Sequence, residues 1–148
     1  MKPTRPNWKT AIKRRAVSLP IREHLIDFLS DPKKRVLDYG CGKGYDADRL
    51  GMFKYDPHFF DDQPAGTFDH VYCGYVLNVM DKKEGQRVVD DMQALLKPRG
   101  TGYVVVRRDH KADNPNQRQV FLDGACLFTN NSKYTIYSFW KDREVTVR

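Results

Sequence analysis

Apolar residues recur along the chain with two different spacings, one typical of helices and one typical of buried strands. An apolar residue occupies every fourth position from Ile21 to Leu29, which predicts a helix with one face toward a core. A second apolar stripe at 88–96 follows Asp81 and Glu84, a D-x-x-E pair that favours a helix start. A continuous apolar run predicts a buried strand at 103–106, and branched or aromatic residues around one charged position predict strands at 36–39 and 52–55. Helices and buried strands in alternation predict an α/β domain.

The C-terminal third departs from this alternation and predicts an antiparallel hairpin. Residues 125–129 and 133–140 flank Asn130-Asn131, a turn signal between two β-prone runs. Earlier in the chain, only eleven residues separate Asp56 from Phe68. That length is too short for a crossover helix followed by another strand. We therefore predict a compact, mostly parallel sheet with a C-terminal antiparallel hairpin.

Length and composition limit what the chain can be. Its 148 residues leave room for one domain, which we expect to span 18–148 after a basic arm at 1–17. The mean hydropathy is −0.70, and neither a membrane span nor a secretory segment is visible, so a cytoplasmic protein is expected. Three cysteines without C-x-x-C spacing predict free thiols and no metal site.

The net charge of +7 comes from the N-terminal part of the chain. Residues 1–35 hold 10 Lys or Arg and 3 acidic residues, which leaves 16 of each for the rest. Trp8 lies among these cations, a composition suited to phosphate contacts and base stacking, so we expect Lys9, Lys13 and Arg14 to contact nucleic acid. A solvated extension that keeps the protein soluble is the alternative interpretation. Charge alone does not separate the two.

The segment 36–44 holds the densest candidate chemistry. A buried strand leads into Gly40, Gly42 and Gly44, which allow a tight turn and a close approach of the backbone to a ligand. The spacing G-x-G-x-G matches neither the dinucleotide fingerprint nor the P-loop. Asp38 lies at the mouth of this loop, where a carboxylate suits a cationic group better than a pyrophosphate. S-adenosylmethionine carries both a sulfonium and an ammonium group.

This strand and loop resemble the first motif of the class I S-adenosylmethionine-dependent methyltransferases. In that family a second strand ends in an acidic residue that binds the ribose hydroxyls; here 52–55 ends in Asp56, 18 residues after Asp38. Residues 68–78 resemble the family's fourth strand and the motif after it, and 95–106 resemble the turn into the fifth strand. The resemblance implies a Rossmann-like methyltransferase fold, S-adenosylmethionine as cofactor and methyl transfer as activity.

The resemblance also implies which residues form the site. The implied cofactor-binding residues are Asp38, Tyr39, Gly40, Cys41, Gly42, Gly44, Asp56, Pro57 and Gly74. Tyr75 and Asn78 follow the fourth strand, and we expect them to touch the substrate or the methyl donor as catalytic residues. An alternative role stays open for each, because Tyr75 also suits a packed aromatic and Asn78 a cap on the next turn. Cys41 is expected to pack and not to act as a nucleophile.

The short segment after Asp56 departs from the family's pattern. The family's third strand and its helix are predicted to be missing, which leaves the adenine side without the acid or amide that relatives supply there. Substitutes in the same loop, each equally consistent with ordinary loop or core, are Asp61 or Asp62 and Phe59 or Phe60. His58 and His70 are candidate bases near the expected crevice, although a lone histidine is more often a structural hydrogen-bonding group. The charged run 107–111 suits an anionic substrate or a solvated loop.

A narrower resemblance, to DNA phosphorothioation-associated methyltransferases, rests on four blocks in the first 79 residues. The blocks are 10–14 with 18–20, 37–42, 55–58 and 74–79. The signatures of amino-methylating DNA enzymes and of cytosine C5 enzymes are both missing from the sequence. Their absence disfavours those two DNA reactions, and the N-terminal charge together with the narrower resemblance leads us to expect a methyltransferase that acts on nucleic acid. Two alternatives stay open: a protein that binds S-adenosylmethionine without transferring its methyl group, by degrading or sensing it or as a subunit, and a nucleic-acid-binding module on a degenerate methyltransferase fold.

Overall fold

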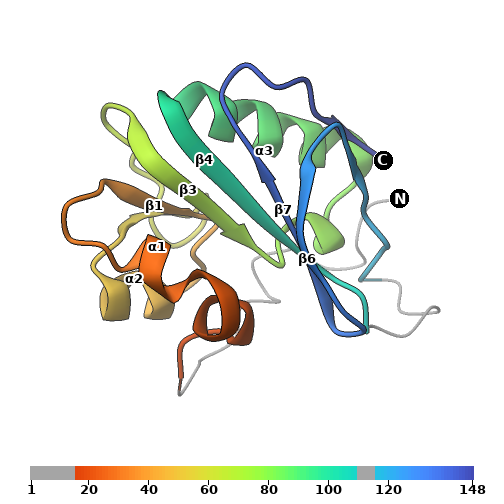
Figure 1. The fold of residues 1–148 in the computed structure, drawn as a ribbon, viewed down its shortest axis with the longest axis horizontal. Coiled ribbons are helices and arrows are strands. Elements are labelled where there is room, and N and C mark those ends of the chain that lie inside the picture. Colours follow the sequence, from red (N-terminus) through yellow and green to blue (C-terminus); the bar gives the residue numbers. More distant parts are fainter. Residues whose placement is uncertain (1–15, 110–115) are drawn as a thin grey trace.

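Six strands form the central sheet in the computed structural model of the chain, which describes residues 16–109 and 116–148. In chain order the strands are β1 Val36–Tyr39, β2 Phe53–Tyr55, β3 Phe68–Gly74, β4 Leu96–Arg107, β6 Cys126–Asn130 and β7 Tyr134–Phe139. Their order across the sheet is β2-β1-β3-β4-β7-β6 (Figure 1). The first four run parallel, and β7 is antiparallel to both of its neighbours. The mostly parallel sheet with a C-terminal antiparallel hairpin is confirmed.

Helices cover the two faces of this sheet unequally. A π-helical turn, η2 (Ile21–Leu25), continues into α1 (Ile26–Leu29) and shares one face with α2 (Tyr45–Leu50). The opposite face carries α3 (Lys82–Leu95) (Figure 1). The remaining elements are the 3-10 turn η3 (Leu77–Val79) and a two-stranded sheet of β5 (Leu122–Asp123) and β8 (Thr146–Val147). No helix among the described residues has the length and apolar character needed to cross a bilayer.

The two apolar stripes found in the sequence become the helical sides of two cores. Ile21 and Leu29 are at most 1% exposed and lie in one core with Tyr72 of β3. Val89 and Met92 of α3 are fully buried in the core on the other face. The predicted start of α3 is confirmed in its main feature, because the Asp81 side chain accepts a hydrogen bond of 2.8 Å from the Glu84 backbone N–H. Periodicity alone was sufficient to locate both helices.

The turn predicted before the fifth strand of the family is instead part of β4. This strand begins at Leu96, directly after α3, and pairs Leu96 with Phe68 and Thr101 with His70. Residues 97–100 therefore form an irregular insertion in the ladder. A Cβ atom at Gly100 would lie 2.8 Å from the Phe68 carbonyl oxygen, so only glycine allows the two strands to approach each other here.

The sheet ends at β2, in agreement with the predicted loss of the family's third strand. Within the described part of the chain no strand pairs with the outer side of β2. After β2 the backbone folds back in a short bridge, in which Asp56 and Phe60 exchange N–H to carbonyl hydrogen bonds of 2.9 and 3.0 Å. Residues 57–67 then lead directly to β3.

Candidate functional site

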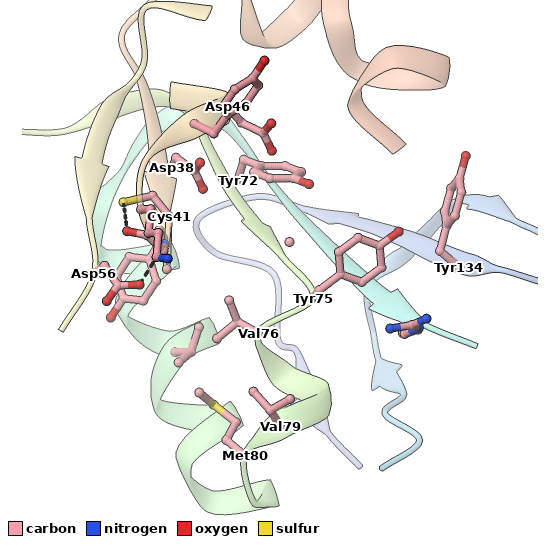
Figure 2. A pocket seen from close by; sticks show the side chains of 18 of the residues that line it. Asp38, Cys41, Asp46, Asp56, Tyr72, Tyr75, Val76, Val79, Met80 and Tyr134 are labelled. Carbon is pink, nitrogen blue, oxygen red and sulfur yellow. Dashed lines mark hydrogen bonds between the residues drawn. The ribbon is translucent and has the colours of Figure 1, made fainter. Parts of the chain in front are cut away.

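A cavity of about 620 Å³ lies at the carboxyl ends of β1 and β3 (Figure 2). Ligands of open parallel sheets bind at this edge. The cavity lining includes eight of the nine residues expected to bind the cofactor, namely Asp38, Tyr39, Gly40, Cys41, Gly42, Asp56, Pro57 and Gly74. The ninth, Gly44, lies just behind the loop as the N-cap of α2, with a φ of 84°. The structure thus brings together residues from three strand ends that are far apart in the sequence.

The glycine loop is attached to the end of β2. The backbone N–H groups of Gly40 and Cys41 donate to the Tyr55 carbonyl oxygen at 2.7 and 3.0 Å. Gly40 has a φ of 79°, and a Cβ atom there would lie 2.7 Å from Cγ2 of Val76. The position therefore needs glycine both for its backbone conformation and for the space in front of Val76.

Asp56 fixes the same loop through its side chain. One carboxylate oxygen accepts from the Gly42 N–H at 2.9 Å, and the other accepts from the N–H groups of His58 and Phe59 at 2.9 and 3.2 Å. A carboxylate offers about four acceptor positions, so about one remains for a ligand. Asp56 is 8% exposed and lines the cavity, where that position suits a hydroxyl donor. Binding of the ribose by Asp56 stays a prediction. The structure adds a second role, in which the Asp56 carboxylate holds the backbone of the glycine loop in place.

Two buried carboxylates form one wall of the cavity. Asp38 and Asp46 are 4% and 8% exposed, and Figure 2 shows them near Tyr72 on the side opposite Val79 and Met80. The Asp46 carboxylate also accepts a hydrogen bond of 3.0 Å from the Ser18 backbone N–H. Negative charge held at low exposure favours a cationic ligand. Asp46 was missed in the sequence, although an acid in the first turn after a ligand-binding loop is a usable signal.

Cys41 is a protonated thiol. Burial, followed by the nearby charges of Asp38 and Asp56, raises the pKa of Cys41 to about 12. Burial also raises the pKa of Cys73 well above its usual range. All three cysteines are free, and Cys126 is the exposed one. The expectation that Cys41 packs and does not act as a nucleophile agrees with this chemistry.

We therefore expect one rapidly reacting thiol in the native protein. At pH 8 a thiol of pKa about 12 is thiolate in roughly one part in ten thousand, so Cys41 should react with an aromatic disulfide reagent orders of magnitude more slowly than Cys126. The release of chromophore measures the number of fast thiols. The Cys126→Ser variant should lose the fast phase, and a fast phase that survives in it would contradict the assignment.

Tyr75 adopts a backbone conformation that non-glycine residues rarely take. It is the one described non-glycine residue with positive φ, at 62°, and its N–H donates to the Val105 carbonyl at 2.9 Å. Such strain costs about 1–3 kcal/mol and persists where the surrounding structure imposes it, often at functional sites. Tyr75 lines the cavity, and Figure 2 shows its ring extending toward Tyr134. Tyr75 is half-buried and also packs against the core on the α1 face, so its ligand-contacting role stays a prediction.

Asn78 does not line the cavity. Its side chain is 1% exposed, and its amide N–H groups donate to the carbonyls of Arg107 and Arg118 at 3.3 and 2.8 Å. Its carbonyl oxygen accepts from the Arg107 N–H at 2.6 Å. These bonds join η3 to the end of β4 and to the segment after residue 116. The expectation that Asn78 touches the substrate is therefore replaced by a structural role as a backbone clamp.

Other candidates from the sequence fall into four groups. His58 lines the cavity, as do Arg107 and Asp109 of the charged run, whose side chains form an ion pair of 2.7 Å. His70, expected near the crevice, lies instead toward the start of β3 and lines a different pocket. The loop residues Phe59, Phe60, Asp61 and Asp62 are not among the cavity-lining residues. Lys9, Lys13 and Arg14 lie outside the described residues.

Several lining residues lie outside the predicted set, some in the turn after β3 and one in the distant strand β7. Val76, Val79 and Met80 form an apolar wall (Figure 2), and Tyr134 enters from β7. The Tyr134 hydroxyl donates to the Glu23 carboxylate at 2.5 Å, and burial followed by this bond raises the pKa of Tyr134 to about 12. Since 111 positions separate the two residues, no local pattern could have paired them.

Comparisons with known proteins relate this chain to methyltransferases. A family model described as a methyltransferase domain matches residues 13–146. No curated protein sequence matches the chain. Among solved structures, a possible histamine N-methyltransferase from Thermotoga maritima, titled an S-adenosylmethionine-dependent methyltransferase, is 14% identical over 90% of this chain and 88% of its own, with a TM-score of 0.52.

Two further structures resemble the chain over half of their own length. LepI in complex with S-adenosylmethionine is 10% identical, over 93% of this chain and 50% of its own, with a TM-score of 0.52. The S-adenosylmethionine-dependent methyltransferase SibL is 12% identical, over 74% of this chain and 52% of its own, with a TM-score of 0.50. At such identities these likenesses establish the fold alone.

Proposed function

Because this chain belongs to the methyltransferase-domain family, whose model covers residues 13–146, we propose that it binds S-adenosylmethionine in its main cavity and transfers the methyl group to an acceptor. One observation carries the proposal. The glycine loop and the buried carboxylates of Asp38 and Asp46 meet at the carboxyl ends of the parallel strands, where this cofactor would find a cradle and opposite charges.

The residues present fit the cofactor. Asp38 and Asp46 suit its cationic amino acid portion, the 40–42 backbone suits close approach, and the acceptor position left on Asp56 suits a ribose hydroxyl. When bound, S-adenosylmethionine supplies an electrophilic methyl group on a sulfonium. Direct transfer of that methyl group to an acceptor needs no covalent nucleophile on the protein. The raised pKa of Cys41, which keeps its thiol protonated, agrees with such a mechanism.

The chain's own residues act by positioning. In methyl transfer the acceptor must lie in line with the methyl group and its leaving group, and holding that alignment supplies much of the acceleration. Tyr75 is held in a strained conformation at the cavity, so its ring is fixed where it can orient an acceptor. Val76, Val79 and Met80 give the cavity a dry wall that excludes water from the reaction. His58 is the lining residue suited to accept a proton from the acceptor.

We further propose that the acceptor is a nucleic acid. The support is the excess of basic residues in 1–35, the narrower resemblance to DNA phosphorothioation-associated methyltransferases, and the presence of Arg107 and Lys133 in the lining. The sequence blocks of that resemblance extend only to residue 79. A protein that binds the cofactor without transferring its methyl group is the alternative, supported by the lack of a strand on the outer side of β2 in 16–109 and 116–148.

Methyl-labelled S-adenosylmethionine tests these proposals directly. We expect the full chain to transfer label to one of a panel of single-stranded and duplex DNA and RNA acceptors, and we expect Tyr75→Ala to lower the rate more than the cofactor affinity. Label found on protein acceptors alone would contradict a nucleic acid acceptor. Label found only in small-molecule products would contradict methyl transfer and favour cofactor breakdown. Absence of cofactor binding in calorimetry would contradict both.

A further inference from the structure

A second pocket, of about 400 Å³, lies toward the amino-terminal ends of the parallel strands. Its lining residues are Lys34, Asp69, His70, Lys97, Pro98 and Arg99. None of them lines the main cavity. His70 and Gly74 belong to the same strand, β3, and Gly74 lines the main cavity. Four steps along an extended strand place His70 and Gly74 roughly 13 Å apart, so the second pocket and the main cavity are distinct sites.

The lining of this second pocket carries excess positive charge. Its one carboxylate, Asp69, accepts hydrogen bonds from the Arg35 backbone N–H at 2.8 Å and from Lys97 Nζ at 3.2 Å, and these lower the pKa of Asp69. The ion pairs found among the described residues leave Lys34 and Arg99 without a carboxylate partner. Three cations against one carboxylate leave the lining with excess positive charge, which suits an anion such as a phosphate group.

His70 lines this pocket and is also one of four neighbouring aromatic rings, which we call the aromatic cluster. It consists of Phe28, His70, Tyr103 and Phe128. Phe28 lies 6.2 Å from Tyr103 and 6.3 Å from both His70 and Phe128, measured between ring centroids. Phe28 is 43% exposed and Phe128 39% exposed, so two large rings of the cluster face solvent. Tyr103 belongs to β4 and Phe128 to β6, and Tyr103 is part of the core on the sheet face that carries α1.

His70 has the properties of a ligand-contacting ring. Its Nδ1 atom is buried without a hydrogen-bond partner among the described residues. Burial lowers the pKa of His70, with smaller opposing effects from the charges of Asp69 and Asp31, so the ring is neutral at pH 7. A neutral imidazole both stacks and hydrogen-bonds.

We propose that the second pocket and the aromatic cluster together bind a single-stranded segment of nucleic acid, with a phosphate against Lys34 and Arg99 and an adjacent base on Phe28 and Phe128. Proteins that hold single strands combine a cationic groove with exposed aromatic rings, because the bases of a single strand are free to stack on a ring. In a duplex the bases are already stacked on each other and do not reach such rings. The inference rests on the nucleic acid acceptor proposed above, and it adds a site that would hold the strand away from the reacting nucleotide.

Fluorescence anisotropy with a labelled single strand of about 12 nucleotides tests this site on the full chain. We expect Phe28→Ala to raise Kd by about 5- to 100-fold without changing its salt dependence, since it removes one stacking ring. The double variant Lys34→Glu, Arg99→Glu should raise Kd and flatten the slope of log K against log salt by about 0.7, the value for one phosphate contact on a single strand.

A matched control separates this site from general attraction to a basic protein. The double variant Lys82→Glu, Lys83→Glu makes the same change of net charge at exposed positions of α3, and it should bind the strand nearly as well as the wild type. Phe128→Ala repeats the stacking test, and melting temperatures show whether each variant is folded. Equal weakening by both double variants, or wild-type affinity in both phenylalanine variants, would overturn the proposal.

Two further measurements separate a failure of this site from a failure of the proposed function. Calorimetry with S-adenosylmethionine should give wild-type affinity in every variant above, because none of the substituted residues lines the main cavity. If the wild type binds the cofactor but not the strand, this inference fails and the cofactor site stands. Duplex DNA or inorganic polyphosphate that competes as well as the single strand would reduce the site to simple anion binding and overturn the proposal.

Discussion

Replacement of Asp38 with Asn is expected to weaken S-adenosylmethionine binding by about 10- to 100-fold. The Asp38 carboxylate is 4% exposed and lines the cavity, so its charge acts on a bound cation with little screening by water. Hydrogen bonds to charged groups contribute about 1.5–3 kcal/mol, and each 1.4 kcal/mol is a tenfold change in affinity. Asparagine keeps the size of the side chain and removes the charge. Isothermal titration calorimetry measures the effect.

Two comparisons sharpen the Asp38 test. Asp142→Asn removes an exposed carboxylate far along the chain from the glycine loop and should leave the affinity unchanged. S-adenosylhomocysteine lacks the sulfonium charge but keeps the ammonium group. If Asp38 acts on the sulfonium, Asp38→Asn should weaken binding of S-adenosylmethionine more than binding of S-adenosylhomocysteine. If Asp38 acts on the ammonium group, the variant should weaken binding of both ligands equally. Wild-type affinity of Asp38→Asn for both ligands would contradict the assigned site.

Replacement of Asn78 with Ala is expected to lower the free energy of unfolding by about 2–4 kcal/mol. The change removes three hydrogen bonds to the backbone of Arg107 and Arg118 and leaves buried polar groups without partners, each at a cost of about 1–3 kcal/mol. For a domain of this size that corresponds to a fall in Tm of roughly 5–15 °C. Calorimetric melting measures it.

The exposed amide of Gln63 provides the control for Asn78. Gln63→Ala should leave Tm within the range of ordinary surface substitutions, about 0.5 kcal/mol. A catalytic role for Asn78 predicts a different pattern, in which the alanine variant melts like the wild type and loses methyl transfer. That outcome would restore Asn78 to the reacting centre.

Local patterns in the sequence were sufficient to predict most of the fold. The fourfold spacing from Ile21 to Leu29, the cap at Asp81 and the turn at Asn131 each depend on neighbouring residues, and each lies where expected. The missing strand was also predictable, because eleven residues between Asp56 and Phe68 cannot hold a helix and a strand. Chain length sets an upper limit on structure without any knowledge of tertiary contacts.

Much of the site's wall could not be predicted, because it is built by contacts between distant residues. The Ser18 N–H bonds to Asp46 across 28 positions, and the Tyr134 hydroxyl bonds to Glu23 across 111. The position of His70 was also beyond prediction from local sequence. The sequence places it four residues before Gly74, and only the direction and register of β3 put that distance between it and the main cavity. A glycine loop is a local motif that the sequence reveals. The rest of the cavity lining comes from separate segments that only the fold brings together.

Among the described residues no strand pairs with the outer side of β2, and an unpaired sheet edge is a route to aggregation. Unpaired backbone groups on an exposed edge can pair with another copy of the chain. Here β2 is only three residues long, and Lys54 in its centre forms an ion pair of 2.6 Å with Asp48. The exposed ring of Phe53 is shielded by the Arg35 guanidinium, 4.5 Å from its centroid. Lys54 and Arg35 therefore place two cations on this short edge, a feature that discourages pairing with another copy of the chain.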